Sequence, residues 1–277
     1  MMVLVMSSNN ISKKSYKTIE SVEKALVLLQ CFTDSTPELS LKELSEKTGY
    51  YKSRVLQICD TLILHGFIIR TQKSVYKLGP KLMVLGKVYE RSNSLISLAP
   101  PILRELSALT GEASKIFVIE GVKRTCLVRE RGPSPLSYNV EEGESFELYA
   151  GAGGKVLLAY APQEFRDRVF DERVVKRLTS TTIVGREKFE QECAEIRSKG
   201  YAVSMGELFA DVAGMAAPIF NNSGEVFASL TIAGPIQRFT DERCQEMLTY
   251  LLSSASKLST LLGSTHPSSH VAMALSA

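Results

Sequence analysis

The fold of this chain is decided by residues 40–57, which read SLKELSEKTGYYKSRVLQ. Ser40 and Glu43 have the spacing of a capping box, in which each side chain accepts a hydrogen bond from the backbone N–H of the other residue at a helix start. The pattern predicts a short helix over residues 41–47. Gly49 then provides a turn, because glycine adopts positive φ at no steric cost.

A second helix is predicted over residues 51–64, where apolar residues recur at helical spacing at Val55, Ile58, Cys59 and Leu62. Outward from this pair, residues 18–32 have the pattern of an amphipathic helix. Residues 67–70 and 75–78 read as two short strands on the other side. Three helices followed by a hairpin are the arrangement of a winged helix-turn-helix.

The start of the second helix carries the side chains that a helix-turn-helix presents to the major groove of DNA, namely Tyr51, Lys52, Ser53, Arg54 and Gln57. Arg54 can donate two hydrogen bonds to a guanine edge, and Gln57 can pair both ways with adenine. Lys52 and Ser53 suit phosphate contacts, which position a protein without reading sequence. We therefore predict double-stranded DNA as a partner.

The distribution of charge favours the same partner. Residues 1–91 contain 14 Lys and Arg against 8 Asp and Glu, whereas the remainder contains 19 against 22. A basic first third on an acidic body indicates that a polyanion binds at one end. In the wing, Arg70 and Lys73 are expected to reach the DNA backbone or minor groove. The main alternative is a ligand-binding or metabolic protein whose winged helix meets a protein instead of DNA.

Composition argues against several other classes. No apolar run approaches the roughly 20 residues that a membrane-spanning helix needs, so we expect a cytoplasmic protein without a membrane partner. The five cysteines are scattered and fit reduced thiols. Histidine occurs at His65, His266 and His270, too few for a catalytic triad or a zinc site. We expect no catalytic residue, no metal and no cofactor; a hydrolase is the weaker alternative.

The rest of the sequence predicts a linker helix over residues 80–92 and a larger domain over residues 93–262. The linker has an apolar stripe at Leu82, Leu85 and Val88. In the larger domain, helices are expected at 94–110 (interrupted by Pro100-Pro101), 150–160, 187–200 and 241–262, and strands at 114–120, 124–131, 201–204, 213–220 and 226–233. Residues 1–17 and 263–277 are expected to be disordered, so the winged helix-turn-helix occupies residues 18–79.

Residues 150–155, AGAGGK, lack the spacing of a phosphate-binding loop, since Tyr149 stands at the first glycine position and Val156 follows the lysine. Two interpretations stay open for this run. Its small residues could leave backbone N–H groups available to an anion at a helix start, or they could allow tight packing of helix against sheet. Glu207 is expected to be structural, and the loop glutamates are expected to be solvated: Glu141, Glu142 and Glu144.

Taken in order, these segments resemble the IclR family of transcription regulators from about residue 18 to residue 262. In the N-terminal part the resemblance is carried by SVEKAL (21–26), LKEL (41–44), TG (48–49), KS (52–53) and YKLG (76–79). In the C-terminal part it is carried by GAGGK (151–155), IRSKGY (196–201), GEL (206–208), MAAPIF (215–220) and residues 229–235. The motifs are weak singly and highly specific in this order and spacing.

The resemblance implies an α+β protein whose second domain is a GAF-like α/β sensor with an antiparallel sheet. It also implies an effector pocket lined by Ala152, Gly153, Ser204, Val212, Gly214, Thr231 and Ala233. Three of these, Ser204, Gly214 and Ala233, replace an acidic residue, a cysteine and a serine of relatives that bind small keto acids, so we expect a roomier and less polar pocket. Tyr51 and Arg54 stand where many relatives have Pro and Thr, so the operator sequence is not transferable.

The combined expectation is a regulator that binds a palindromic operator as a homodimer or homotetramer and acts as a repressor rather than an activator. A small organic acid would control it. We expect that acid to be held through its carboxylate and to carry a larger apolar or aromatic body than pyruvate has.

Overall fold

The computed structural model describes residues 17–33, 35–72, 74–92, 94–134, 140–170 and 175–265. The chain forms two compact units, one that ends at Ser92 and one that begins at Asn93. Each unit has a hydrophobic core of its own. The disorder expected at the two ends concerns residues that lie almost entirely outside the described ranges. Gly263 and Ser264 are described, and their N–H groups donate to Thr260 and Ser259 at the end of the last helix.

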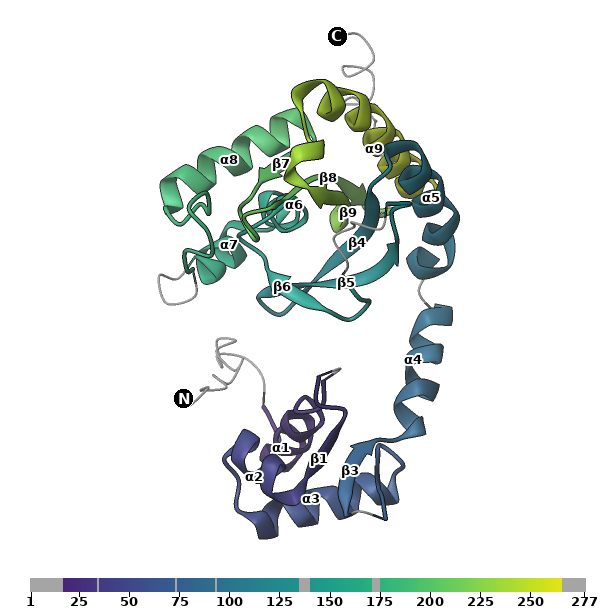
Figure 1. Cartoon of the computed structure of the whole chain (residues 1–277), viewed down its shortest axis with the longest axis vertical. Helices are drawn as coiled ribbons and strands as arrows, with labels where there is room; N and C mark the ends of the chain where they lie inside the picture. Colours follow the sequence, from purple (N-terminus) through teal and green to yellow (C-terminus); the bar gives the residue numbers. More distant parts are fainter. Residues whose placement is uncertain are drawn as a thin grey trace. The chain divides into compact units, whose positions relative to one another are not determined.

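Unit 1 begins with three helices and a small antiparallel sheet (Figure 1). These three helices are α1 (Glu20–Leu29), α2 (Leu41–Thr48) and α3 (Lys52–Leu64), and the strands are β1 (Glu38–Ser40), β2 (Ile68–Arg70) and β3 (Val75–Leu78). The strand order is β1-β3-β2. The predicted helix-turn-helix and hairpin are confirmed in kind, whereas β1 was not predicted. A three-residue strand has too little sequence pattern of its own and exists through pairing with β3.

The helices of unit 1 are held by one apolar cluster and by local capping. Leu28, Leu44, Val55 and Cys59 have no exposed surface. Burial of a leucine or valine side chain stabilises the fold by about 1.5–3 kcal/mol. At the start of α2 the expected capping box is present, with Ser40 Oγ accepting from the Glu43 N–H at 3.3 Å and Glu43 Oε2 accepting from the Ser40 N–H at 2.7 Å.

Helix α4 (Pro80–Ser92) follows β3 and ends unit 1. Pro80 suits the first helical position, where a backbone N–H has no partner within the helix. Large apolar side chains remain exposed along this helix: Met83, Val84, Leu85, Val88 and Tyr89. An apolar helix face in water is unfavourable, so the exposed side chains of α4 are available for a further contact.

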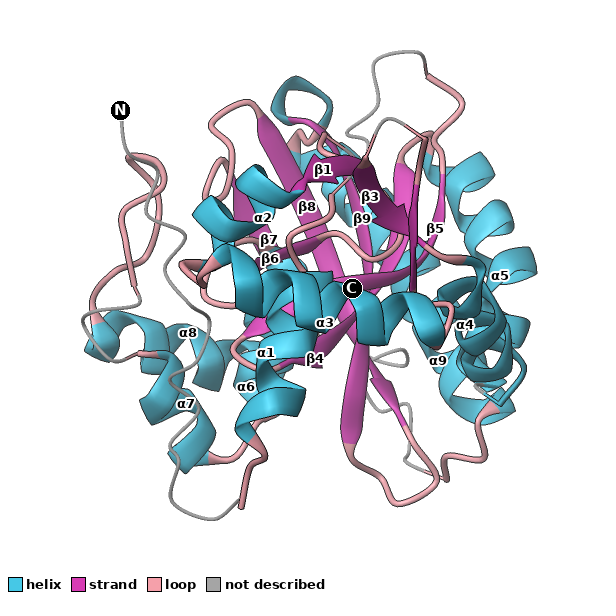
Figure 2. Ribbon diagram, turned by 90° about the horizontal axis from the view of Figure 1, so that it is seen from below, coloured by secondary structure: helices cyan, strands magenta, loops and turns pink. Residues whose placement is uncertain are grey.

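Unit 2 is built on one six-stranded antiparallel sheet, drawn in magenta in Figure 2. In spatial order its strands are β6 (Ser145–Glu147), β5 (Lys123–Glu130), β4 (Ala113–Glu120), β9 (Val226–Pro235), β8 (Val212–Phe220) and β7 (Ala202–Met205). Helices α5 (Ser94–Thr110) and α9 (Asp241–Leu261) cover one face, and α6 (Ala152–Tyr160), α7 (Gln163–Val169) and α8 (Arg186–Lys199) lie on the other (Figure 1).

Alternation along β8 shows how both faces of this sheet are buried. Met215 and Ala217 belong to the apolar cluster shared with α5 and α9, whereas Ala216 belongs to the cluster shared with α6 and α8. Because successive side chains of a strand point to opposite faces, Gly214 shares the α6 face with Ala216. The sheet is therefore the middle layer between two helical layers.

The structure corrects the expected interruption at Pro100-Pro101, because α5 runs unbroken from Ser94 to Thr110. Each proline removes one helical hydrogen bond. Burial of Ala99, Ile102 and Leu103 against the sheet offsets that loss. The short elements β6, α7 and the 3-10 helix Ile236–Arg238 were also not predicted.

Candidate nucleic-acid interface and ligand pocket

The first candidate surface is the exposed face at the start of α3. Val55, Ile58, Cys59 and Leu62 bury one side of this helix, as the sequence pattern predicts. The opposite side exposes all five side chains expected to meet DNA at this helix: Tyr51, Lys52, Ser53, Arg54 and Gln57. Tyr51 is 87% exposed, which leaves a large aromatic ring in water at the helix start.

The turn before α3 is fixed by local geometry. Gly49 has φ 72°, the left-handed conformation expected for it. Ser45 Oγ donates to the Tyr50 carbonyl at 2.6 Å, and Thr48 Oγ1 donates to the Leu44 carbonyl at 2.7 Å. Beside the turn lies an open depression of about 630 Å³, lined by Ser45, Glu46 and residues 49–53. The start of α3 is therefore held rigidly next to a concave surface.

Two of the predicted base-reading residues contact one another in the isolated chain. Arg54 Nη1 donates to Gln57 Oε1 at 3.3 Å. Both side chains are exposed, so they can exchange this bond for bonds to bases. In the wing, the guanidinium of Arg70 lies 5.8 Å from the ring centre of Tyr76 and is exposed. Lys73, the other predicted wing contact, lies outside the described residues.

The second candidate site is the α6-facing side of the large sheet. Strand pairing places Ser204 opposite Gly214 and Gly214 opposite Ala233, so these three predicted pocket residues form one row across β7, β8 and β9. Thr231 lies two residues before Ala233 on β9, and Val212 lies two residues before Gly214 on β8, so both point to the same face as this row. Ala152 and Gly153 begin the helix that covers this face. The structure thus brings the predicted residues to one side of the sheet.

Close packing accounts for the glycines of α6. A Cβ atom on Gly153 would lie 2.6 Å from Thr231 Oγ1, and a Cβ on Gly154 would lie 2.2 Å from the Leu148 carbonyl oxygen. No Cβ fits at such distances without movement of its neighbours. The small-residue run therefore allows tight contact of helix and sheet, which was one of its two interpretations.

An ion-pair network fixes the first turn of α6. Lys155 Nζ donates to Glu207 Oε1 at 2.6 Å, to Glu192 Oε1 at 2.7 Å and to the Val203 carbonyl at 2.8 Å. The second oxygen of Glu207 accepts from the Gly151 N–H at 3.2 Å. Lys155 is 1% exposed, and the two carboxylates compensate for its burial. Glu207 therefore has the structural role expected from the sequence.

A buried arginine holds the loop before α6. Arg124 of β5 donates to the carbonyl groups of Ala150 and Glu147. Its guanidinium lies 5.0 Å from the ring centre of Phe117 and 5.7 Å from that of Phe146. Through these contacts β5 and β6 position residues 147–151, and hence the start of α6.

Sequence reasoning missed Lys115, a lysine of β4 that is 1% exposed. In the strand register Lys115 lies opposite Thr231 of β9 and opposite Arg129 of β5, and its side chain points to the α6 face. Burial lowers the pKa of its ammonium group from 10.5 to about 8, and Cys126 and Arg129 lie among its charged or titratable neighbours. The signal available in the sequence was a lone cation directly before the apolar run of residues 116–119.

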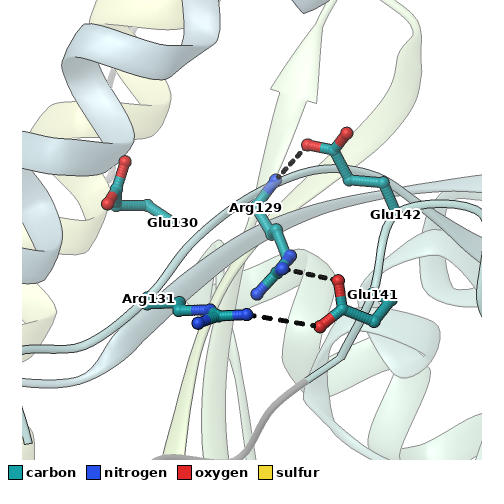
Figure 3. Close-up of a pocket in the computed structure, with 5 residues that line it drawn as sticks. All are labelled: Arg129, Glu130, Arg131, Glu141 and Glu142. Carbon is teal, nitrogen blue, oxygen red and sulfur yellow. Dashed lines mark hydrogen bonds and ion pairs between the residues drawn. The ribbon is translucent and has the colours of Figure 1, made fainter.

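The acidic loop is more ordered than the sequence suggests (Figure 3). Glu141 pairs with Arg129 at 2.5 Å and with Arg131 at 3.7 Å, and Glu142 accepts from the Arg129 backbone N–H at 3.2 Å. Glu144 accepts from the Glu141 N–H at 3.0 Å. The three glutamates are exposed, as expected of a solvated loop, and the neighbouring strand adds arginine contacts to Glu141 and Glu142 that were not expected. An open pocket of about 410 Å³ lies here, lined by Arg129, Glu130, Arg131, Glu141 and Glu142.

Within the described residues, no cluster of His, Cys, Asp and Glu has the makings of a metal site. In the same part of the chain, no helix is both long and apolar enough to cross a bilayer. The cysteines are free thiols, and burial raises the pKa of Cys59, Cys126 and Cys193 to about 12 each.

Comparison with protein families assigns both units. The family model described as Bacterial transcriptional regulator IclR C-terminal matches residues 88–260, and the IclR helix-turn-helix domain matches residues 21–71. The chain is 29% identical over 246 residues to HTH-type transcriptional regulator KipR of Bacillus subtilis, which covers 89% of this chain and 98% of the relative. It is 25% identical over 256 residues to Transcriptional repressor IclR of Escherichia coli, with 88% and 90% covered.

Solved structures agree. An IclR transcriptional regulator from Alicyclobacillus acidocaldarius superposes with a TM-score of 0.79 at 27% identity, over 89% of this chain and 100% of that one. An IclR homolog from Microbacterium hydrocarbonoxydans in complex with 4-hydroxybenzoate gives a TM-score of 0.76 at 21% identity, over 87% and 98%, and this likeness is one of fold. The relatives are transcriptional regulators rather than enzymes, and the chain belongs to the IclR family of bacterial transcriptional regulators.

Proposed function

We propose that this protein is a repressor that binds a palindromic operator through α3 and leaves it when a small organic acid binds in unit 2. The observation that carries the proposal is the start of α3, where five polar or aromatic side chains are exposed on a helix whose other side is buried. A rigid helix with a polar N-terminal face is what the major groove accommodates.

The proposed contacts with DNA are of two kinds: some read the base sequence, and others position the protein on the phosphate backbone. Arg54 and Gln57 are assigned to base edges, since each can form two hydrogen bonds to one base. Lys52 and Ser53 at the helix start, with Arg70 and Lys73 of the wing, are assigned to phosphates, and Tyr51 extends the same surface. Phosphate contacts contribute affinity that falls steeply with salt concentration.

Assembly into a dimer or tetramer follows from the size of the interface. One helix-turn-helix covers one half-site, so a two-fold operator needs two copies of unit 1. The exposed apolar side chains of α4, among them Leu85 at 45% and Val88 at 51% exposure, offer a surface that a second copy can bury. Leu82 on the same helix is half-buried.

The ligand is proposed from the pocket and from relatives. Gly214 and Ala233 add little bulk and no polar side-chain group to the row that Ser204 begins, so we favour a ligand that is larger than a small keto acid. A homologue of the same fold has been solved with 4-hydroxybenzoate, an aromatic acid. Related chains include repressors. The acid can release the operator only if it binds the DNA-free conformation more tightly than the DNA-bound one.

A gel shift tests the DNA-binding part. The full chain is incubated with the DNA that flanks its own gene and with random DNA of equal length, at two salt concentrations. We expect a specific complex that weakens steeply with salt. Equal binding to both DNAs, or none, would instead favour the alternative in which the winged helix meets a protein. Because bacterial operators lie in the cytoplasm, that compartment is part of the proposal.

A further inference from the structure

The residue before α3 stabilises neither this helix nor the core of unit 1. Tyr51 is the N-cap of α3, and its side chain forms no capping hydrogen bond. Serine, threonine, aspartate and asparagine stabilise an N-cap position, because their oxygens accept from the open backbone N–H groups. The Tyr51 side chain is 87% exposed, so burial does not stabilise it either. A residue that breaks a local rule without a structural gain is expected at a functional surface.

The neighbouring tyrosine shows what a structural role at this turn involves. Tyr50 is half-buried and packs against the apolar cluster of unit 1. The ammonium group of Lys24 lies 5.7 Å from the centre of its ring. Within the described residues, the Tyr51 side chain has neither a ring contact nor a hydrogen-bond partner. Its whole ring is therefore available to a partner outside this chain.

The backbone nevertheless fixes where the Tyr51 ring can lie. The Tyr51 carbonyl accepts from the N–H groups of Arg54 at 2.9 Å and Val55 at 3.0 Å. Val55 has no exposed surface and anchors the helix to the core. A tyrosine side chain rotates about two bonds, so little conformational entropy is lost when a partner binds it. The ring is thus a prepared contact, three residues before Arg54.

The turn that carries this ring borders the open depression beside α3. The depression has a volume of about 630 Å³ and is lined by Ser45, Glu46 and residues 49–53. A Cβ atom on Gly49 would meet nothing within 4 Å. Glu46 and Lys52 bring one charge of each sign to the lining, so the depression does not concentrate positive charge for a phosphate. The protein leaves this space open to a neutral group of the DNA.

The chemistry of the major groove identifies that neutral group. Base edges there present hydrogen-bond donors and acceptors, together with one apolar group, the C5 methyl of thymine. The carbon atoms of an aromatic ring complement an apolar group and not a donor or an acceptor. A phosphate contact through the phenolic oxygen of Tyr51 is the alternative. The two contacts differ in what removal of that oxygen does.

We propose that Tyr51 is a specificity-determining residue, whose ring reads the C5 methyl of one thymine in each half-site of the operator. This inference rests on the proposed function, because it assigns a base contact to the same DNA-binding surface. It adds an apolar contact to the hydrogen bonds that Arg54 and Gln57 are proposed to form with guanine and adenine.

Replacement of thymine by uracil tests the contact. Uracil pairs with adenine as thymine does and lacks only the C5 methyl. The full chain is titrated, by fluorescence anisotropy, with the DNA that flanks its own gene and with duplexes in which each thymine of the bound site is replaced singly by uracil. We expect one replacement in each half-site to weaken wild-type binding about three- to fivefold, the factor that corresponds to one buried methyl group.

Variants of one residue identify the side chain that reads the methyl. Tyr51→Ala should bind the thymine and uracil duplexes with equal affinity, whereas Tyr51→Phe keeps the ring and should keep the wild-type ratio. The matched control is Leu64→Ala, because Leu64 is an apolar residue at the other end of α3 that is 81% exposed. It should leave the ratio unchanged. Tyr51→Ser should melt at or above the wild-type temperature, since serine caps a helix.

Each other outcome counts against the inference. A wild type that binds its site specifically but tolerates every uracil overturns the inference alone. A Tyr51→Ala variant that keeps the preference for thymine shows that another side chain reads the methyl. Equal loss of affinity for the site and for random DNA in Tyr51→Phe would make the phenolic oxygen a phosphate contact, and a lower melting temperature of Tyr51→Ser would make the residue structural. A wild type that binds no DNA specifically contradicts the proposed function, and the inference falls with it.

Discussion

Two buried lysines of unit 2 differ in what surrounds them. Lys155 contacts two carboxylates and a backbone carbonyl within 2.8 Å. Lys115 lies in a row with Arg129. A buried charge with two close counter-ions holds a fold together, whereas Lys115 has charged neighbours of both signs, Arg129, Arg124 and Glu112. The same residue type is therefore buried in two different electrostatic surroundings.

The cost at Lys115 predicts how stability depends on pH. Burial lowers the pKa of this lysine from 10.5 to about 8 in the folded chain, where Cys126, Arg129, Arg124 and Glu112 act on it. The unfolded state binds this proton more tightly, so the penalty is complete below about pH 8 and vanishes as pH rises toward about 10.5. We expect Lys115→Met to be the more stable protein at pH 7, by up to about 3 kcal/mol.

The measurement is urea unfolding of both proteins between pH 7 and pH 10. The difference in free energy of unfolding should shrink as the pH rises, because the wild-type lysine becomes neutral when folded. A variant that is less stable than wild type at pH 7 would show that the contacts of the lysine outweigh its desolvation.

Arg54 is the residue whose removal should change sequence preference. We expect Arg54→Ala to weaken operator binding by about 1–3 kcal/mol and to relax the preference at one base pair. Fluorescence anisotropy on the operator, on its single-base variants and on random DNA measures both effects. Lys42→Ala, which removes an exposed lysine of α2, is the control. Equal loss of affinity for operator and random DNA would make Arg54 a phosphate contact instead.

At the level of the element, α6 depends on glycines that its propensity disfavours. Glycine inside a helix costs about 1 kcal/mol relative to alanine. Gly153 is nevertheless required where the helix meets Thr231, Phe117 and Ser229 of the sheet. Packing therefore overrides local propensity at the start of α6.

Two alanine substitutions compare packing with propensity. In Gly153→Ala the added methyl would meet Thr231 Oγ1 at 2.6 Å, whereas around Gly86 of α4 there is nothing within 4 Å of the added atom. We expect Gly153→Ala to lose about 1–3 kcal/mol of stability and Gly86→Ala to gain up to about 1 kcal/mol. Thermal unfolding measures both, and a stabilised Gly153→Ala would contradict the tight packing of α6 on β9.

At the level of the whole molecule, regulation requires that events in the two units be linked. A ligand in unit 2 changes operator affinity only by its differential affinity for the two conformations. Linkage is reciprocal, so an acid that releases the operator as proposed must itself bind more weakly, by the same factor, when operator DNA is bound. Assembly is the other property that belongs to this scale, since an operator with two half-sites is recognised by more than one chain.

The exposed α4 stripe provides a test of assembly. Leu85→Asp should yield monomers in light scattering and lose operator binding at micromolar concentration, because a charge cannot be buried in an apolar seam without a large penalty. Leu109→Asp is the matched control, since Leu109 of α5 is 47% exposed against 45% for Leu85. It should leave both properties unchanged. A wild-type protein that is monomeric at that concentration contradicts the proposed seam.

Local signals in the sequence were sufficient for the helix-turn-helix. The capping box at Ser40, the turn at Gly49 and the apolar spacing of α3 depend on residues a few positions apart, so they specify these elements without distant contacts. The exposed face of α3 follows directly, because the residues that are not buried must face solvent. Order and spacing of the motifs also indicated the family, and the family models confirm it.

Only the tertiary structure decided what lies beside the proposed ligand pocket. Lys115, Ser229 and Thr231 are joined by the register of β4 with β9, across more than a hundred residues of chain. The ion pairs of Glu141 likewise depend on the return of the loop to β5. Strand register places residues opposite one another through contacts made along the full strands, and no local spacing in the sequence records which residue faces which.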